Sequence, residues 1–350
     1  MPSLAPGEFA PETTYLNTAS YGLPSTRALT AVRDASATWA TGRGGPTASL
    51  DQLVPGLRAG FARLLDGAAA DDIALGSGVA GLIAPVAAAL PAGAEVLLPE
   101  GEFASVSMPF VYRGDLVVRF VPLAELAAQV RPETALVAVS VVQSADGRVT
   151  DLAELRAATR AAGARLLVDA TQAAGWLPLR FADADYWVCA SFKWLIGARS
   201  VAFLATTPEL VPQLRPIGSS WYAAEDRWAE LYHPTALPAT ARRFDTTPDW
   251  LGVVAAAAGL SLIEELTVDK IGAHNVELAD RFRAGLRQLG FEPVTERSPI
   301  VSVPGAGNMA ARLEQADVIV SARGGGLRFA FHLYNSDDDV ERALSALRAG

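Results

Sequence analysis

Two segments in the middle of the chain hold the side chains best suited to chemistry. LLVDATQAAG (residues 166–175) places Asp169 at the end of an apolar run and Gln172 three residues later. DYWVCASFKWLIG (residues 185–197) places Lys193 among apolar neighbours, which disfavour the ammonium form and leave a nucleophilic amine. Pyridoxal phosphate (PLP) requires a lysine that forms a Schiff base and an acid that pairs with its pyridinium nitrogen. Asp169 and Lys193 therefore predict a PLP site.

A glycine-rich loop earlier in the chain has two interpretations. The stretch from Gly76 to Gly81 spells G-x-G-x-x-G between a strand-like and a helix-like run, and Glu100 closes the next strand-like run. In that form it predicts dinucleotide binding and an NAD-dependent oxidoreductase. The same loop can instead bind the phosphate of PLP, because both ligands place an anion at a helix N-terminus. Lys193 and Asp169 favour PLP, since a dinucleotide needs neither.

The elements that must position these residues alternate between strands and helices. From Ile73 to about Leu204, the predicted strands are DIAL, AEVLL, LVVRFV, ALVAVSVV, RLLVDA, DYWVCA and VAFLA. Continuous apolar runs suit a mostly parallel sheet that is buried on both faces. Helical segments such as TDLAELRAATRAAG separate several of them, with Gly163 as a candidate C-cap. The pattern predicts an α/β fold with its ligand site at the carboxyl ends of the strands.

The two ends of the chain have a different pattern of predicted secondary structure. Residues 1–20 predict an extended N-terminal arm, and long helices are predicted near 250–266 and 272–289. The tail then alternates strand-like PIVSVPG, ADVIVSA and GLRFAFHLYN with the helical SDDDVERALSALR. We therefore expect a large PLP-binding domain over residues 21–250 and a smaller α+β domain over residues 251–350.

Composition restricts the class of protein. The 350 residues are 51% hydrophobic with a net charge of −9, so the chain can bury a sizeable core and makes a poor partner for nucleic acid or anionic membranes. Cys189 is the only cysteine, which excludes an intramolecular disulfide and is typical of the cytoplasm. The first residues lack the features of a secretory signal, and the prolines and glycines of 75–94 favour a buried helix over a membrane span. No metal-ligand spacing is offered by the histidines, His233, His274 and His332.

The chain resembles the class V aminotransferase family of fold-type I PLP enzymes. This family includes cysteine desulfurases, kynureninases and isopenicillin N epimerase-like proteins. The resemblance extends from YLNTASYG (residues 15–22) to LRFAFHLYNSDDDVERAL, and its strongest parts are VSVVQSADGRVTDLAEL, LLVDATQAAG and CASFKWL. It implies the fold-type I architecture, with a large domain around a mostly parallel sheet and a smaller C-terminal domain.

The resemblance also implies roles around the cofactor ring. Asp169 matches the partner of the pyridinium nitrogen, Gln172 the side chain near the ring oxygen, and Lys193 the Schiff-base lysine. Ser144 lies where many members carry an asparagine near the same oxygen, and neighbouring Gln143 is a second candidate.

Two other groups are expected to hold the ring face and the phosphate. Phe103 matches the position whose ring stacks on the cofactor, which requires only a flat π-face. Ser77, Gly78 and Val79 match the loop that binds the phosphate with backbone N–H groups and a hydroxyl.

Further matches concern a partner subunit and the substrate. RRFDTTPDW (residues 242–250) resembles an R-F-x-x-G-T-P segment whose threonine reaches the partner subunit's phosphate. Thr247 is the match, although Thr246 replaces the usual glycine, and the resemblance implies a homodimer with shared active sites. Arg328 matches the arginine that binds the substrate α-carboxylate through its planar fork, and Arg323 is a second candidate.

Departures from the family pattern limit the predicted reaction. Phe192 replaces the usual histidine before the lysine, and residues 197–200 replace a G-P-x-G turn. No cysteine follows Cys189, so the usual desulfurase nucleophile is missing and Cys189 is expected to be inert core. We expect a PLP-dependent enzyme for an amino acid or amine-bearing metabolite, with class V aminotransferase-type chemistry through Lys193. PLP-dependent lyase, epimerase and kynureninase-like hydrolase are the alternatives, and the Trp-rich segment 219–232 is either interface or substrate cover.

Overall fold

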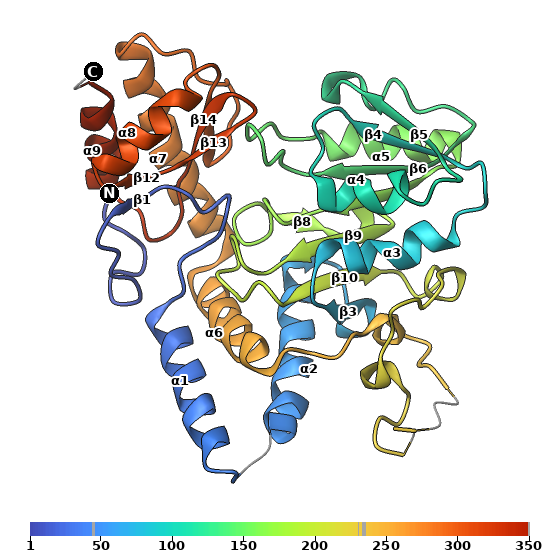
Figure 1. The fold of residues 1–350 in the computed structure, drawn as a ribbon. Coiled ribbons are helices and arrows are strands. Elements are labelled where there is room, and N and C mark those ends of the chain that lie inside the picture. The colour runs from blue at the N-terminus through green and yellow to red at the C-terminus, as the bar shows by residue number, and fades with distance from the viewer. Residues whose placement is uncertain (44–45, 230, 233–235, 349–350) are drawn as a thin grey trace.

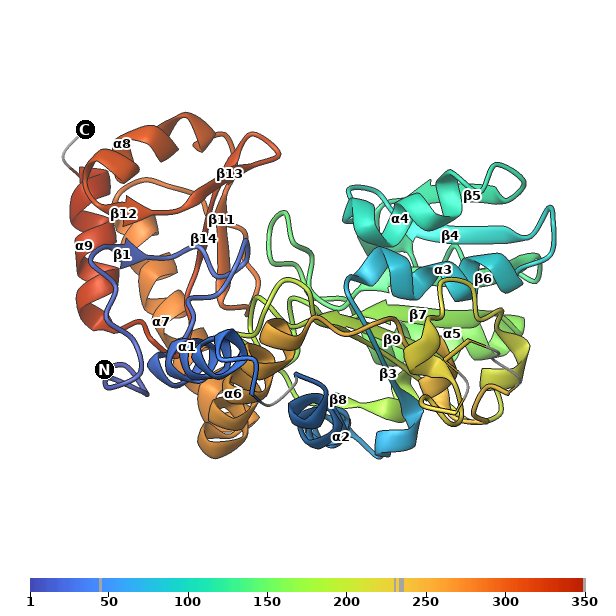
Figure 2. The same cartoon turned by 60° about the horizontal axis from the view of Figure 1, so that its bottom comes forward.

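The computed structural model describes residues 1–43, 46–229, 231–232 and 236–348. These residues form a seven-stranded central sheet, a three-stranded C-terminal sheet and two short two-stranded pairs. Figures 1 and 2 show the C-terminal elements gathered on one side of the molecule, with the helix-flanked central sheet on the other.

All the apolar runs that were predicted as strands between Ile73 and Leu204 lie in the central sheet. Its order is β3-β10-β9-β7-β6-β4-β5, and pairing is parallel from β9 to β5, while β10 runs antiparallel to both β9 and β3. A mostly parallel sheet is thus confirmed. The strands are β3 (Ile73–Gly76), β4 (Glu95–Pro99), β5 (Val117–Val121), β6 (Thr134–Ser140), β7 (Arg165–Asp169), β9 (Tyr186–Ala190) and β10 (Ala202–Thr206).

Successive strand side chains enter two separate cores, because the pleat alternates them across the sheet. On β6, Val137 and Val139 pack with helices α2 (Pro46–Leu64), α5 (Leu152–Ala162) and α6 (Trp250–Leu266). Leu136 and Ala138 face the opposite core, which contains α3 (Val79–Ala89) and α4 (Ala104–Val111). Gly163 ends α5 in the left-handed conformation with φ 73°, which confirms the predicted C-cap.

The C-terminal region follows a sharp break in the chain. Helix α7 (Val268–Gln288) starts four residues before the predicted helix, because Thr267 alone, with φ 67°, separates it from α6. Strands β11, β14 and β13 then form an antiparallel sheet. The remaining C-terminal elements are β11 (Ile300–Val303), α8 (Ala310–Gln315), β12 (Val318–Ile319), β13 (Ser321–Arg323), β14 (Gly326–Ala330) and α9 (Asp337–Arg348).

The N-terminal arm packs on this C-terminal region. Strand β1 (Thr14–Tyr15) pairs in parallel with β12 before helix α1 (Thr26–Ala40) begins. A second short pair joins β2 (Leu65–Asp66) to β8 (Leu179–Arg180). The predicted domain boundaries near residues 20 and 250 stay predictions.

Within the described residues, no single helix is long and apolar enough to cross a membrane. Helices α6 and α7 pass the length and composition test only together, as a pair bent by 84°.

The strand register brings polar residues to one edge of the sheet. Ser140 and Asp169 end β6 and β7 and are direct partners across the parallel ladder. Lys193 follows β9 by three residues, and Ser77 follows β3 directly. The predicted chemistry therefore meets at the carboxyl ends of strands, where ligands bind in open α/β sheets.

Candidate active site

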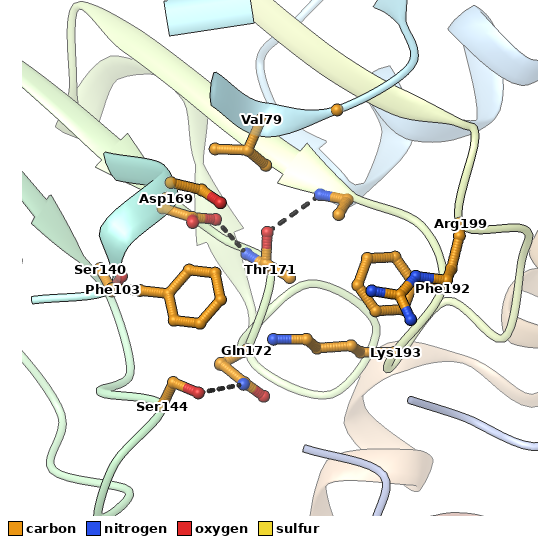
Figure 3. A pocket seen from close by; sticks show the side chains of 13 residues that line it. Val79, Phe103, Ser140, Ser144, Asp169, Thr171, Gln172, Phe192, Lys193 and Arg199 are labelled. Carbon is orange, nitrogen blue, oxygen red and sulfur yellow. Dashed lines mark hydrogen bonds between the residues drawn. The ribbon is translucent and has the colours of Figure 1, made fainter. Parts of the chain in front are cut away.

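A cavity of about 210 Å³ lies at this edge of the sheet (Figure 3). Seven of the residues that were predicted from the sequence line it, together with six that were not given a role. The predicted residues are Gly78, Val79, Phe103, Ser144, Asp169, Gln172 and Lys193; the others are Ser105, Ser140, Thr171, Ala190, Phe192 and Arg199.

Lys193 is a buried amine at the centre of the cavity. Only 5% of the residue is exposed, so it is not a surface lysine, and its Nζ lies 5.1 Å from the ring centroid of Phe103 and 5.7 Å from that of Phe192. Burial lowers the pKa of Lys193 to about 8, with Asp169 opposing the shift and Arg328 adding to it. About a tenth of this amine is therefore unprotonated and nucleophilic at pH 7, far more than for a lysine with an ordinary pKa.

Asp169 places a carboxylate in the same buried space. The backbone N–H of Thr171 donates to its Oδ1 at 2.7 Å, and Thr171 Oγ1 in turn accepts the N–H of Ala190 at 2.9 Å. Burial raises the pKa of Asp169 to about 6, while the Thr171 hydrogen bonds and Lys193 lower it and Glu102 raises it. Above pH 6 the carboxylate is charged and able to pair with a protonated ring nitrogen. Thr171 was missed by the sequence analysis, although it lies between the two residues of the motif that were identified.

Gln172 connects the cavity to the predicted substrate arginine. Its Nε2 donates to Ser144 Oγ at 3.1 Å and to the carbonyl of Ala19 at 2.9 Å, and its Oε1 accepts the indole N–H of Trp194 at 2.8 Å. Ser144 also accepts from Arg328, through its carbonyl and, at 3.1 Å, through its hydroxyl. Ser144 therefore bridges the cavity wall to Arg328.

Gln143, the second candidate, points elsewhere. Its amide donates to Glu102 Oε2 at 3.2 Å and does not line the cavity. Glu102 also accepts the N–H of Phe103 at 2.7 Å and the hydroxyl of Ser140 at 2.6 Å, so it fixes the start of α4. Phe103 is 46% exposed and lines the cavity, so its ring is available for stacking rather than packed in the core.

The glycine-rich loop forms the start of α3, with Gly78 as N-cap and Val79 as first helical residue. Both line the cavity, whereas Ser77 is exposed and does not. The preceding strand β3 is at the sheet edge and antiparallel to its neighbour, so the loop is not the central parallel turn of a dinucleotide fold. The geometry favours a phosphate at the helix N-terminus over NAD.

Arg328 is a buried cation without an acidic partner. It is 1% exposed and donates to Ser20 Oγ at 2.8 Å and Ser321 Oγ at 3.1 Å, in addition to Ser144. Across the described residues, no carboxylate oxygen lies within 4.0 Å of it. Burial lowers its pKa to about 9, and Arg323 adds to the shift. Arg323 is exposed and donates to the same Ser20 hydroxyl at 3.3 Å; neither arginine lines the cavity itself.

The end of the N-terminal arm completes this side of the site. Besides Ser20 and Ala19, Gly22 donates its N–H to the carbonyl of Phe192 at 2.8 Å. A Cβ at Gly22 would overlap the carbonyl oxygen of Lys193, so only glycine permits this close approach. The sequence contained a signal for this contact, the YLNTASYG segment, but no pattern that assigned roles within it.

Two predicted residues, Thr247 and Cys189, and the described part of the Trp-rich segment do not line the cavity. Thr247 is exposed, and α6 is capped at Asp249 rather than by Thr247. Cys189 is fully buried in β9, where burial raises the pKa of its thiol, in agreement with an inert core residue. In the Trp-rich segment, Trp221 packs on Trp228 with ring centroids 5.6 Å apart, and the described part of the segment does not line the cavity. His233 lies outside the described residues.

The side chains on the cavity fit PLP. A buried amine, a buried carboxylate, an exposed aromatic ring and a helix N-terminus are the four features that would hold the lysine-linked carbon, ring nitrogen, ring face and phosphate of that cofactor. When bound, PLP supplies an electron sink for negative charge at the substrate Cα. Lys193 Nζ is then the amine able to take or return a proton there.

Comparisons with known proteins agree with this geometry. The aminotransferase class-V family model matches residues 43–343. An uncharacterized aminotransferase of Bacillus subtilis (strain 168), YcbU, is 28% identical over 309 residues, covering 83% of this chain and 81% of the relative. Isopenicillin N epimerase of Amycolatopsis lactamdurans is 28% identical over 323 residues, covering 81% of each chain.

A solved structure has the same fold as this chain. The cystine C-S lyase C-DES, in complex with its reaction product cysteine persulfide, superposes with a TM-score of 0.87 at 23% identity, covering 96% of this chain and 97% of that chain. At this identity the match shows the fold. With most of its length matched by the family model, this chain belongs to the class V aminotransferase family and is a PLP-dependent enzyme of the fold-type I architecture.

Proposed function

We propose that the enzyme acts on an α-amino acid whose carboxylate is bound by Arg328, with transamination as the reaction. The observation that carries the proposal is the buried, acid-free guanidinium of Arg328, which is linked to the cavity wall by Ser144. A buried cation without a counter-ion is costly, and an incoming carboxylate removes that cost. The Coulomb effect of Arg328 on the pKa of Lys193 supports proximity of the two groups.

Within this proposal each residue has one task. Asp169 pairs with the ring nitrogen, Gln172 and Ser144 lie near the ring oxygen, and Phe103 stacks on the ring. Lys193 moves the proton at the substrate Cα, and its lowered pKa suits a general base near neutral pH. Lyase, epimerase and kynureninase-like reactions begin with binding of substrate at the same cofactor site, and they remain the alternatives. A desulfurase of the usual kind is disfavoured because Cys189, the only cysteine, is buried.

The test compares substrates with and without the α-carboxylate. Holoenzyme is assayed against a panel of amino acids and the matching decarboxylated amines, by following the cofactor spectrum and the products. Arg328→Ala should lower kcat/KM on the amino acids by roughly 30-fold to several thousand-fold, which corresponds to about 2–5 kcal/mol for an unpaired buried charge. The amines should be almost unaffected.

Arg323→Ala is the matched control, because Arg323 shares the Ser20 hydroxyl but is exposed. A selective loss in Arg323→Ala alone would move the carboxylate site to Arg323. Equal loss on amino acids and amines in Arg328→Ala would make Arg328 structural and overturn the proposal.

We further propose that the enzyme is a cytoplasmic homodimer with shared active sites. Thr247 is exposed in the single chain and lies on the segment that follows Asp245, whose carboxylate accepts the N–H of Leu75 in β3 at 2.9 Å. Thr247 is exposed and lies two residues after Asp245, which is hydrogen-bonded to the strand before the glycine-rich loop. It is therefore available to a second subunit.

A further inference from the structure

Arg199 is a second cation on the cavity wall, six residues after Lys193. Its guanidinium carbon lies 5.1 Å from the ring centroid of Phe192, within the range of a cation–π contact. Arg199 is exposed, and no carboxylate oxygen in the described part of the chain lies within 4.0 Å of it. Its charge is thus available to an anion in the cavity.

The cofactor brings an anion that needs such a charge. A phosphate monoester carries about −1.5 to −2 at pH 7. The start of α3 supplies backbone N–H groups and a partial positive charge of only about half a unit. Among the thirteen residues that line the cavity, the cations are Lys193 and Arg199. Lys193 is committed to the cofactor's aldehyde carbon, so Arg199 is the remaining full positive charge.

The position of Arg199 relative to the other cavity residues agrees with this assignment. Figure 3 shows Asp169 and Phe103 at one end of the cavity and Phe192 and Arg199 at the other, with Lys193 between them. On PLP, the ring oxygen and the phosphate arm flank the carbon that bonds to lysine. With Ser144 and Gln172 on the oxygen side, the arm points away from them.

We propose that Arg199 binds the cofactor phosphate, together with the N-terminus of α3, and that the Phe192 ring holds its guanidinium in place. Phe192 has no hydrogen-bond donor in its side chain, so its contribution to the anion is made through Arg199. The inference rests on the proposed placement of the ring nitrogen at Asp169.

The turn that carries Arg199 is well fixed. Ile196 adopts a left-handed φ of 46°, rare for a β-branched residue, and its N–H donates to the carbonyl of Lys193 at 3.2 Å. Ser191 Oγ donates to the carbonyl of Ala198 at 2.8 Å, and Gly197 donates to the carbonyl of Ser191 at 2.9 Å. These bonds close the loop between Lys193 and Arg199, so the backbone that carries the two cations is held in place.

The experiment compares PLP with pyridoxal, which lacks the phosphate. Apoprotein of the wild type, Arg199→Ala and Arg199→Lys is titrated with each compound, and the dissociation constants are measured from absorbance and fluorescence. Arg199→Ala should weaken PLP binding about 10- to 100-fold, the usual effect of losing a charge-assisted hydrogen bond, and should leave pyridoxal binding within about twofold. Arg199→Lys should fall between wild type and alanine for PLP.

Arg215→Ala serves as the control, because Arg215 is exposed and does not line the cavity while its removal changes net charge equally. Unchanged PLP affinity in Arg199→Ala, or an equal loss for PLP and pyridoxal, would overturn the assignment. Attachment of PLP to Lys193 in the wild type is tested separately by borohydride labelling. The proposed function is tested by the substrate preference of Arg328→Ala and the inference by cofactor affinity, so failure of one can be told from failure of the other.

Discussion

At the scale of single residues, the site depends on two ionisable groups whose pKa values are displaced toward each other. Burial lowers the pKa of Lys193 to about 8 and raises that of Asp169 to about 6. Between these two values the carboxylate is charged, while part of the lysine is already neutral. Groups displaced in this way are common at catalytic sites, where acid and base must both work near neutral pH.

The Lys193 pKa predicts how cofactor incorporation depends on pH. Only the neutral amine attacks an aldehyde, and with a pKa of about 8 its fraction rises from about a tenth at pH 7 to about a half at pH 8. The rate of PLP incorporation into apoprotein, followed by absorbance, should therefore increase about fivefold over this interval and level off above pH 9. A rate that keeps rising to pH 10 or beyond would indicate an ordinary lysine pKa and contradict the account.

At the scale of elements, a buried ion pair connects the strand before the glycine-rich loop to the segment before Thr247. Arg58 on α2 pairs with Asp245 and also donates to the carbonyl of Ile73, while Asp245 accepts the N–H of Leu75. Both side chains are buried, with 8% and 0% exposed. The pair therefore joins α2, β3 and the 245–247 segment.

Breaking this pair should destabilise the protein strongly. Asp245→Ala leaves Arg58 buried without its partner, and we expect a loss of about 3–5 kcal/mol in the free energy of unfolding. Arg63→Ala, on the same helix as Arg58, removes an exposed ion pair with Glu264 of α6 and should cost about 0–1 kcal/mol. Both changes in the free energy of unfolding are measured by urea titration of the apoproteins at one fixed protein concentration. Similar small losses in the two variants would contradict the structural role given to Asp245.

The sequence predicted elements better than it predicted the contacts between them. The runs such as ALVAVSVV became strands because continuous apolar residues suit a sheet covered on both faces. The antiparallel edge position of β3 was not predicted, since the local pattern of a strand does not encode its neighbour. Likewise, Ser20 meets Arg328 across 308 positions of sequence, a contact that no local spacing reveals. Arg199 was noted only as part of the 197–200 segment that replaces a G-P-x-G turn, because its proposed role depends on the cavity.

At the scale of the whole molecule, the proposed dimer predicts complementation between inactive subunits. Lys193→Ala removes the amine of a subunit's own site, whereas Thr247→Ala would remove a contact made to the site of its partner. In a mixed dimer, one site then carries both lesions and the other carries neither. Mixing the two variants under conditions of proven subunit exchange should restore up to about half of the wild-type activity per mixed dimer. No recovery would indicate that each site is complete within one subunit.

Attachment of PLP to Lys193 is tested most directly by locating the cofactor on the chain. The sequence contains only two lysines, Lys193 in the cavity and the exposed Lys270, so the chain supplies its own control. Holoenzyme is reduced with borohydride, digested and analysed by mass spectrometry. A pyridoxyl modification is expected on the peptide that contains Lys193 and none on the Lys270 peptide, with the label lost in Lys193→Ala. Labelling of Lys270 alone, or equal labelling of both lysines, would contradict it.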